Sequence, residues 1–233
     1  MTWLRRIGIL LAVIAALVSW PAYQLFTELD KARSEDPLVW ESAIADLEIA
    51  ANGPAGSVLF VGSSSIRLWD TLTSDMAPLT TIQRGFGGAK VGDAIHYVDR
   101  LMAVPEPAAI VLFVGTNDIT PERVRSLDYM LASFATLVSR IRAFHPDVPI
   151  YNIAITPSPL RWAVWPEALA VNAAIEDAAG AMSRVYTIDT GSALMSGGVP
   201  DPDNYIFDGL HLSKRGYSIW TEIIRGRLLQ DLQ

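Results

Sequence analysis

Five short apolar runs alternate with segments of helical spacing along most of the chain, and this alternation restricts the fold more than any other feature. The runs are continuous and rich in Val, Ile and Leu, as strands buried on both faces are. Strands separated by helices pair in parallel, so we expect an α/β fold in which helices cover both faces of one five-stranded sheet. The expected strands are residues 57–62, 78–85, 108–115, 149–156 and 184–189, and the expected helices are residues 40–51, 92–102, 122–145, 166–182 and 213–232.

Composition excludes several classes of function. Of the 233 residues, 51% are hydrophobic and 18% are charged, which suits a chain with a large core. The net charge is −7 and no cluster of Lys and Arg is visible, so no nucleic-acid partner is expected. The chain has no cysteine, and its three histidines are scattered, so neither thiolate chemistry nor a metal site is expected.

The N-terminus carries an apolar run. Arg5 and Arg6 precede an uncharged stretch from Ile7 to Phe26, which as a helix would be about 30 Å long, the thickness of a bilayer core. Basic residues before the run and none close behind it favour an orientation with the N-terminus inside the cytoplasm. One alternative is a cleaved signal peptide, although the end of the run offers a poor cleavage site. A second alternative is a buried helix of a soluble protein.

These features predict that the chain has three parts, an anchor, a linker and a main domain. Residues 1–26 are expected to form a single-pass signal anchor in the cell membrane, and the charged residues 27–38 a linker. Residues 39–233 then form the main domain. An anchor with this orientation places that domain outside the cytoplasm, in the periplasm or the extracellular space.

Three consecutive serines, residues 63–65, follow the first apolar run. Ligands of parallel sheets bind beyond the carboxyl ends of the strands, so these hydroxyls lie where a site is expected. A serine nucleophile needs a base within hydrogen-bond reach and a carboxylate behind the base. His96 and His145 lie in or at the end of expected helices, whereas His211 lies in loop-like sequence three residues after Asp208.

Four motifs occur in order and together extend over most of residues 55–230. They read "FVGSSSIRLW", "RGFGGAK", "FVGTND" and "DGLHLSKRGY". In this order they resemble the signature blocks of the SGNH hydrolases, the GDSL-type esterases and lipases, in a variant with GSSS in the first block.

The resemblance implies a flavodoxin-like SGNH fold and a role for particular residues. The nucleophile is implied to be Ser64, two positions after Gly62, with His211 as the base and Asp208 as the acid. The family usually has Asp where this chain has Ser63, a departure that puts the geometry of the turn in doubt more than the activity. Ser63 is expected to shape the turn, and Ser65 is assigned no chemistry.

The second and third blocks imply an oxyanion hole. In the family pattern, the backbone N–H groups of Ser64 and Gly88 and the side-chain amide of Asn117 bind the oxyanion. Asp118 is expected to be a structural residue. The loop after the fourth expected strand contains aromatic and basic side chains that could line a substrate cleft, or pack in the ordinary way. These residues are Arg161, Trp162 and Trp165.

The sequence therefore predicts a serine hydrolase that cleaves carboxylic esters of small molecules, glycans or lipids and needs no cofactor. One alternative keeps the fold but passes the acyl group to an envelope glycan, as an acyltransferase. Another alternative is a binding module without catalytic activity. The complete set of motif residues argues against this alternative. The natural ester, the acyl chain length and the oligomeric state do not follow from the sequence.

Overall fold

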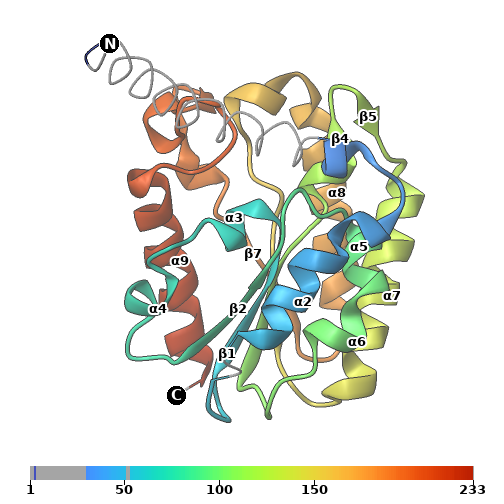
Figure 1. The fold of residues 1–233 in the computed structure, drawn as a ribbon. Coiled ribbons are helices and arrows are strands. Elements are labelled where there is room, and N and C mark those ends of the chain that lie inside the picture. The colour runs from blue at the N-terminus through green and yellow to red at the C-terminus, as the bar shows by residue number, and fades with distance from the viewer. Residues whose placement is uncertain (1–2, 4–29, 51–52, 233) are drawn as a thin grey trace.

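The chain folds around one five-stranded parallel sheet with the strand order β2-β1-β3-β6-β7 (Figure 1). A computed structural model describes Trp3, residues 30–50 and residues 53–232. The expected fold class, a three-layer α/β/α sandwich of flavodoxin-like strand order, is confirmed. The strands are β1 (Val58–Gly62), β2 (Thr81–Gly85), β3 (Ala109–Phe113), β6 (Ile150–Ile153) and β7 (Val185–Ile188).

The order of the strands follows from their burial. β1 and β3 lie in the middle of the sheet, and every residue in them is buried, as their continuous apolar sequences predict. β1 pairs in parallel with β2 on one side and with β3 on the other. The sheet reverses its order of strand addition at this pair. In open α/β sheets, such a reversal leaves a crevice at the carboxyl ends of the two strands.

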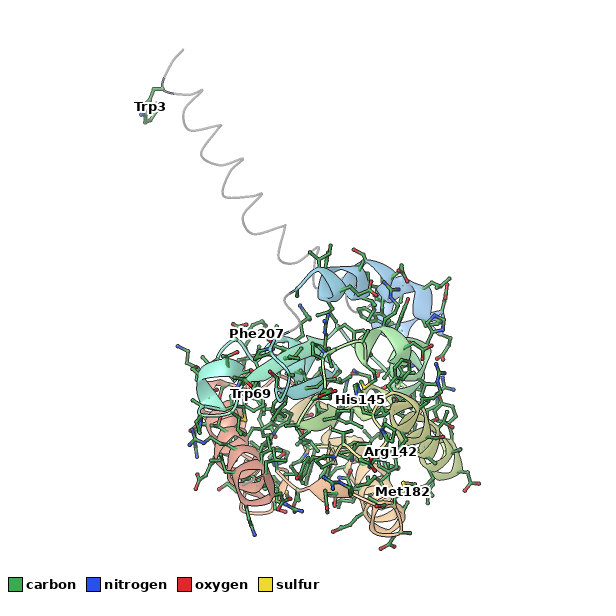
Figure 2. The ribbon with its side chains drawn as sticks, turned by 90° about the horizontal axis from the view of Figure 1, so that it is seen from below. Trp3, Trp69, Arg142, His145, Met182 and Phe207 are labelled. Carbon is green, nitrogen blue, oxygen red and sulfur yellow. The ribbon has the colours of Figure 1, made fainter. Side chains whose placement is uncertain are left out.

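Two sets of helices cover the two faces of the sheet (Figure 1). Alternate residues of β1 point to opposite faces: Phe60 joins the cluster that includes Trp69 and Trp220, and Val61 joins the other cluster. Trp69 is fully buried among the side chains of its face (Figure 2). One face carries α3 (Ser64–Arg67), α4 (Leu72–Asp75) and α9 (Lys214–Leu232), and the other carries α2 (Glu41–Ile49), α5 (Val91–His96), α6 (Val98–Leu101), α7 (Leu127–Phe144) and α8 (Trp165–Gly180).

The sequence did not predict several short elements in the loops. Two antiparallel ribbons of two-residue strands follow the third and fifth strands of the sheet. The loops also contain short 3-10 helices. These elements are β4 (Ile119–Thr120), β5 (Arg123–Val124), β8 (Met195–Ser196), β9 (Val199–Pro200), η1 (Pro37–Trp40), η2 (Thr116–Asp118), η3 (Pro159–Val164), η4 (Ser192–Leu194) and η5 (Pro202–Asn204).

The expected anchor at residues 7–26 lies outside the described residues, and so does the extra N-terminal helix of the expected fold. Within the part of the chain that is described, no helix combines the length and the apolar character needed to cross a membrane. The described part of the expected linker packs against the domain. There, Lys90 donates a hydrogen bond to the carbonyl of Ser34, and Tyr97 donates one to the carbonyl of Pro37.

Candidate active site

Ser64 lies directly after β1, at the first position of α3. Gly62, the last residue of β1, has no room for a side chain, because a Cβ there would lie 2.6 Å from the carbonyl oxygen of Phe113. This close packing brings the turn against the end of β3. Ser63 is fully buried at the N-cap of α3, and its hydroxyl has no hydrogen-bond partner in the described structure. The turn thus directs Ser64, rather than Ser63, toward the crevice.

His211 connects Ser64 with Asp208. Its Nε2 lies 2.9 Å from Ser64 Oγ, and its Nδ1 lies 2.6 Å from Asp208 Oδ2. Ser64 and His211 are 147 positions apart in the chain, so only the fold brings them together. The three side chains form one continuous line of hydrogen bonds.

The carboxylate of Asp208 is held by its own loop. Its Oδ1 accepts hydrogen bonds from the backbone N–H groups of Leu210 at 2.9 Å and His211 at 3.0 Å. Burial opposes the charge on this carboxyl, but the bonds from the His211 ring and from the two N–H groups outweigh it and lower its pKa. Asp208 is therefore charged at neutral pH.

A small bridge closes the loop that carries Asp208 and His211. Tyr205 and Leu212 pair across it, and the N–H of Ile206 donates to the carbonyl of His211 at 2.9 Å. The hydroxyl of Tyr205 donates to the carbonyl of Pro157, which ties the loop to the segment after β6. Phe207, at the tip, is 96% exposed (Figure 2). The base of the loop is thus fixed while its tip faces solvent.

Asn117 and Gly88 lie beside each other at the carboxyl end of the sheet. Asn117 follows β3 in η2 and is buried, and its Nδ2 donates to the carbonyl of Ala89 at 3.0 Å. A Cβ on Gly88 would lie 4.0 Å from that Nδ2 and 2.5 Å from the Cβ of Ala32. Glycine is therefore required at position 88 by close approach.

Arg161 reaches from η3 to the turn that carries Asn117. Its Nη2 donates to Asn117 Oδ1 at 2.7 Å, and its Nη1 donates to the carbonyl and the hydroxyl of Thr116 at 2.6 and 2.8 Å. Burial lowers the pKa of Arg161 to about 10, although Glu122 and Asp118 favour its charge. Arg161 lines both cavities beside Asn117 and also orients the amide of Asn117, and a role in substrate binding stays a prediction.

The two tryptophans of the same loop pack on each other. The rings of Trp162 and Trp165 stack with centroids 6.3 Å apart and an angle of 19° between their planes. Trp165 also packs against the core. Ordinary packing accounts for these contacts, and a role in substrate binding remains a prediction.

Two adjoining cavities surround the line from Ser64 to Asn117. A cavity of about 10 Å³ is lined by Ser64 and Asn117, and a cavity of about 200 Å³ is lined by Asn117 but not by Ser64. They share Asn117, Arg161 and Leu210. The small cavity is lined by Ser64, Ser65, Phe113, Thr116, Asn117, Thr156, Ser158, Arg161 and Leu210.

Several of these residues could not be assigned to the cavity from the sequence. Thr156, Ser158 and Leu210 were not singled out, and Ser65 was assigned no chemistry, although it lines the small cavity. Thr156 ends an expected strand and Ser158 follows it, where the rule on parallel sheets already pointed. Which hydroxyls in such a loop turn inward depends on its exact path, so no sequence signal identified them.

The other two histidines lie in a helix and at the end of a helix. His96 is exposed on α5 with its ring against Tyr97, and His145 follows the last residue of α7 with its Nε2 3.0 Å from the carbonyl oxygen of Met102. Asp118 accepts a hydrogen bond from the N–H of Val91 at 2.9 Å and is fully buried, as a structural residue would be. Within the described residues, no group of three or more potential ligands could hold a metal ion.

Comparison with known proteins assigns the family. The model of the GDSL-like lipase/acylhydrolase family matches residues 53–219. The chain is 29% identical over 204 residues to an isoamyl acetate-hydrolyzing esterase 1 homolog from Mus musculus, covering 72% of this chain and 81% of the mouse protein. It is 28% identical over 174 residues to the homolog from Bos taurus, covering 64% of this chain and 69% of the bovine protein.

Solved structures agree on the fold. A GDSL-like lipase from Bacteroides thetaiotaomicron matches with a TM-score of 0.67 and 20% identity, over 84% of this chain and all of that one. A lipase/acylhydrolase from Enterococcus faecalis matches with a TM-score of 0.62 and 19% identity, over 76% and 97% of the two chains. The chain therefore belongs to the GDSL-like lipase/acylhydrolase family, as an esterase with the α/β fold of the SGNH hydrolases.

Proposed function

We propose that this esterase cleaves carboxylic esters through a catalytic triad of Ser64, His211 and Asp208. The observation that carries the proposal is the unbroken line of hydrogen bonds from Asp208 Oδ2 through the imidazole to Ser64 Oγ. Asp208 accepts from Nδ1–H of His211, so Nε2 is the nitrogen that is free to accept a proton.

The first half of the reaction forms an acyl-enzyme. Ser64 Oγ attacks the carbonyl carbon of the ester while His211 Nε2 takes the hydroxyl proton. The resulting imidazolium is stabilised by the charged carboxylate of Asp208. When the tetrahedral intermediate collapses, Nε2 returns the proton to the leaving alcohol and the acyl group stays on Ser64. Water then attacks the acyl-enzyme by the same route and releases the acid.

The oxyanion is bound by the N–H groups of Ser64 and Gly88 and by the amide of Asn117. An amide nitrogen carries two hydrogens, and Ala89 accepts only one from Asn117 Nδ2. The other hydrogen is available to the developing negative charge. One such donor typically contributes about 3–4 kcal/mol to transition-state stabilisation.

We further propose that the acyl group is short, of acetyl size. A cavity of about 10 Å³ has room for roughly one water-sized group, so a long acyl chain does not fit beside Ser64. The mouse and bovine relatives are named for hydrolysis of isoamyl acetate, an ester of the same short acid.

Isoamyl acetate is therefore the first substrate to test. Release of acetate by the wild type, and its loss in Ser64→Ala with retained folding, is the expected result. Acetylated glycans and lysophospholipids form the comparison panel. Acetyl transfer to a glycan acceptor in preference to water would instead support the acyltransferase alternative, and the absence of both hydrolysis and transfer would support a binding module.

A further inference from the structure

The segment of residues 30–36, which precedes the first helix of the domain, lies over the loops that follow β2 and β3. We call it the N-terminal strap. Figure 1 shows the start of this segment in blue, beside β4. The Cβ of Ala32 lies where a side chain at Gly88 would clash, 2.5 Å from an ideal Cβ at that position. The strap thus packs directly on the backbone proposed to bind the oxyanion.

Three basic side chains hold the strap in place. Lys90, which is only 4% exposed, donates to the carbonyl of Ser34 at 2.7 Å. Arg123 donates to the carbonyl of Arg33 at 3.0 Å and pairs with Glu35 at 3.3 Å. Arg125 forms a second ion pair with Glu35. Contacts from two separate loops therefore fix the strap, rather than a single surface bond.

The strap forms one wall of the larger cavity, of about 200 Å³. Ala32 and Arg33 contribute this wall, and Leu160 and Arg161 belong to the loop after β6. The full lining is Ala32, Arg33, Asn117, Thr120, Pro121, Glu122, Arg123, Leu160, Arg161 and Leu210. Because Asn117, Arg161 and Leu210 also line the cavity at Ser64, one bound molecule can occupy both.

We propose that this cavity binds the alcohol part of the ester, and that the N-terminal strap determines which alcohols fit. The inference rests on the proposed function: with the acyl group confined beside Ser64, the rest of the substrate must extend elsewhere. This cavity, of about 200 Å³, is far larger than the cavity of about 10 Å³ beside Ser64, and its size suits a small alcohol.

The side chains at the cavity indicate the chemistry of that alcohol. Ala32, Pro121, Leu160 and Leu210 offer apolar surface to an aliphatic body. Leu160 is 56% exposed, so this side of the cavity opens to solvent. The preferred substrates are therefore short-acyl esters of small aliphatic alcohols.

Two ester series test the assignment. One series varies the alcohol at constant acyl group (methyl, butyl and hexyl acetate), and the other varies the acyl group at constant alcohol (methyl acetate, butanoate and hexanoate). kcat/KM is measured for each ester with the wild type and two variants. Leu160→Trp enlarges a side chain that lines the cavity and does not belong to the strap, and Glu35→Lys places a like charge beside Arg123 and Arg125 and loosens the strap.

We expect Leu160→Trp to lower kcat/KM for hexyl acetate, relative to methyl acetate, by about tenfold, the scale of discrimination by one apolar pocket. Glu35→Lys should alter the same ratio several-fold, and neither variant should change the order of the acyl series. Leu169→Trp, on the exposed face of α8, and Glu106→Lys, in an exposed loop, are the matched controls and should leave both series unchanged.

Three outcomes would overturn the inference: a changed order in the acyl series, an equal loss for all five esters, or no change in any ratio. The first would mean that the cavity binds the acyl group. The second would mean that the strap and Leu160 only support the oxyanion donors. Failure of the proposed function itself is distinguished by a separate readout, the labelling of Ser64 by a fluorophosphonate probe.

Discussion

The guanidinium of Arg161 donates a hydrogen bond of 2.7 Å to Oδ1 of Asn117 and thereby fixes which end of that amide faces Gly88. With Oδ1 engaged, the nitrogen end points toward the carbonyl of Ala89 and the proposed oxyanion position. An amide without this partner could rotate and present its oxygen, which would repel a negative charge. Arg161 is therefore a positioning residue for Asn117.

Replacing Arg161 by Ala should lower kcat by about 10- to 100-fold with little change in KM, because an oxyanion donor acts mainly in the transition state. Asn117→Ala should lower kcat at least as much. Steady-state kinetics on a short acetate ester measure both constants. Added guanidinium should partly restore Arg161→Ala but not Asn117→Ala, and Arg140→Ala, an exposed residue paired with Asp99, serves as the control. An effect of Arg161→Ala on KM alone would contradict the positioning role.

Ser64→Ala should abolish ester turnover, while Ser63→Ala and Ser65→Ala should retain much of it. Of these three serines, Ser64 is the one whose hydroxyl lies within hydrogen-bond reach of His211. A fluorophosphonate probe, followed by mass spectrometry, should label the wild type on the peptide that contains Ser64. Labelling that persisted in Ser64→Ala would show that a different hydroxyl is the nucleophile.

Activity should fall toward acidic pH, because a protonated His211 cannot accept the proton of Ser64. Asp208 should not cause this fall. Its pKa is below the usual value, so the carboxylate stays charged where imidazoles titrate. Asp208→Asn should lower turnover by about 10³-fold or more, since the imidazolium loses its counter-charge. Profiles of kcat/KM against pH for the wild type, Asp208→Asn, His211→Ala and His96→Ala test these roles, and a severe loss in a folded His96→Ala would contradict the assignment.

Asp118 should make the fold less stable as pH rises from about 4 to 6. Burial raises its pKa to about 6, despite the hydrogen bond from Val91 and the nearby charge of Lys90. Between the unfolded and folded pKa values, the folded state binds the proton that the unfolded state has lost, so stability declines with pH. A shift of about two units corresponds to about 3 kcal/mol.

The variant Asp118→Asn isolates this effect, because the asparagine oxygen can still accept from Val91 and cannot ionise. Urea unfolding of both proteins at pH 4, 6 and 8 gives the difference in unfolding free energy. The unfolding free energy of the variant, relative to that of the wild type, should increase from pH 4 to pH 8. A difference that is constant with pH would mean that Asp118 titrates normally in the folded state.

We also propose that residues 7–26 anchor the protein in the membrane with its domain outside the cytoplasm. The proposal rests on Arg5 and Arg6, the uncharged run and the poor cleavage site. External protease added to spheroplasts should digest the domain. A mature N-terminus near residue 23 would agree with export but would rule out the anchor.

Much of the sheet was predictable because its inner strands β1, β3 and β6 are buried on both faces. The continuous apolar sequence of β1 and β3 leaves no strand face for solvent, so their place at the centre follows from the residues alone. β4, β5, β8 and β9 have only two residues each, too few for any periodicity. Their pairing depends on how the loops pack.

The candidate site was likewise predictable only in part. Ser64, Asp208 and His211 stand in motifs, so the sequence predicted them as candidates, whereas the distances among them depend on the fold. Arg161 was expected at the cleft for its charge, but its bonds to Thr116 and Asn117 depend on the path of η3. No local pattern indicated that Ala32, from the expected linker, would lie on Gly88.

The carboxylate of Asp208 binds the ring of His211 and also the backbone N–H of the same residue. Acid and base are thereby joined within one loop, independently of the sheet. A displacement of this loop would carry both together and preserve their mutual alignment, while changing only the gap between Nε2 and Ser64 Oγ. An inactive form of the enzyme would then differ from the active one only in the distance between His211 Nε2 and Ser64 Oγ, and the hydrogen bond between His211 and Asp208 would be kept.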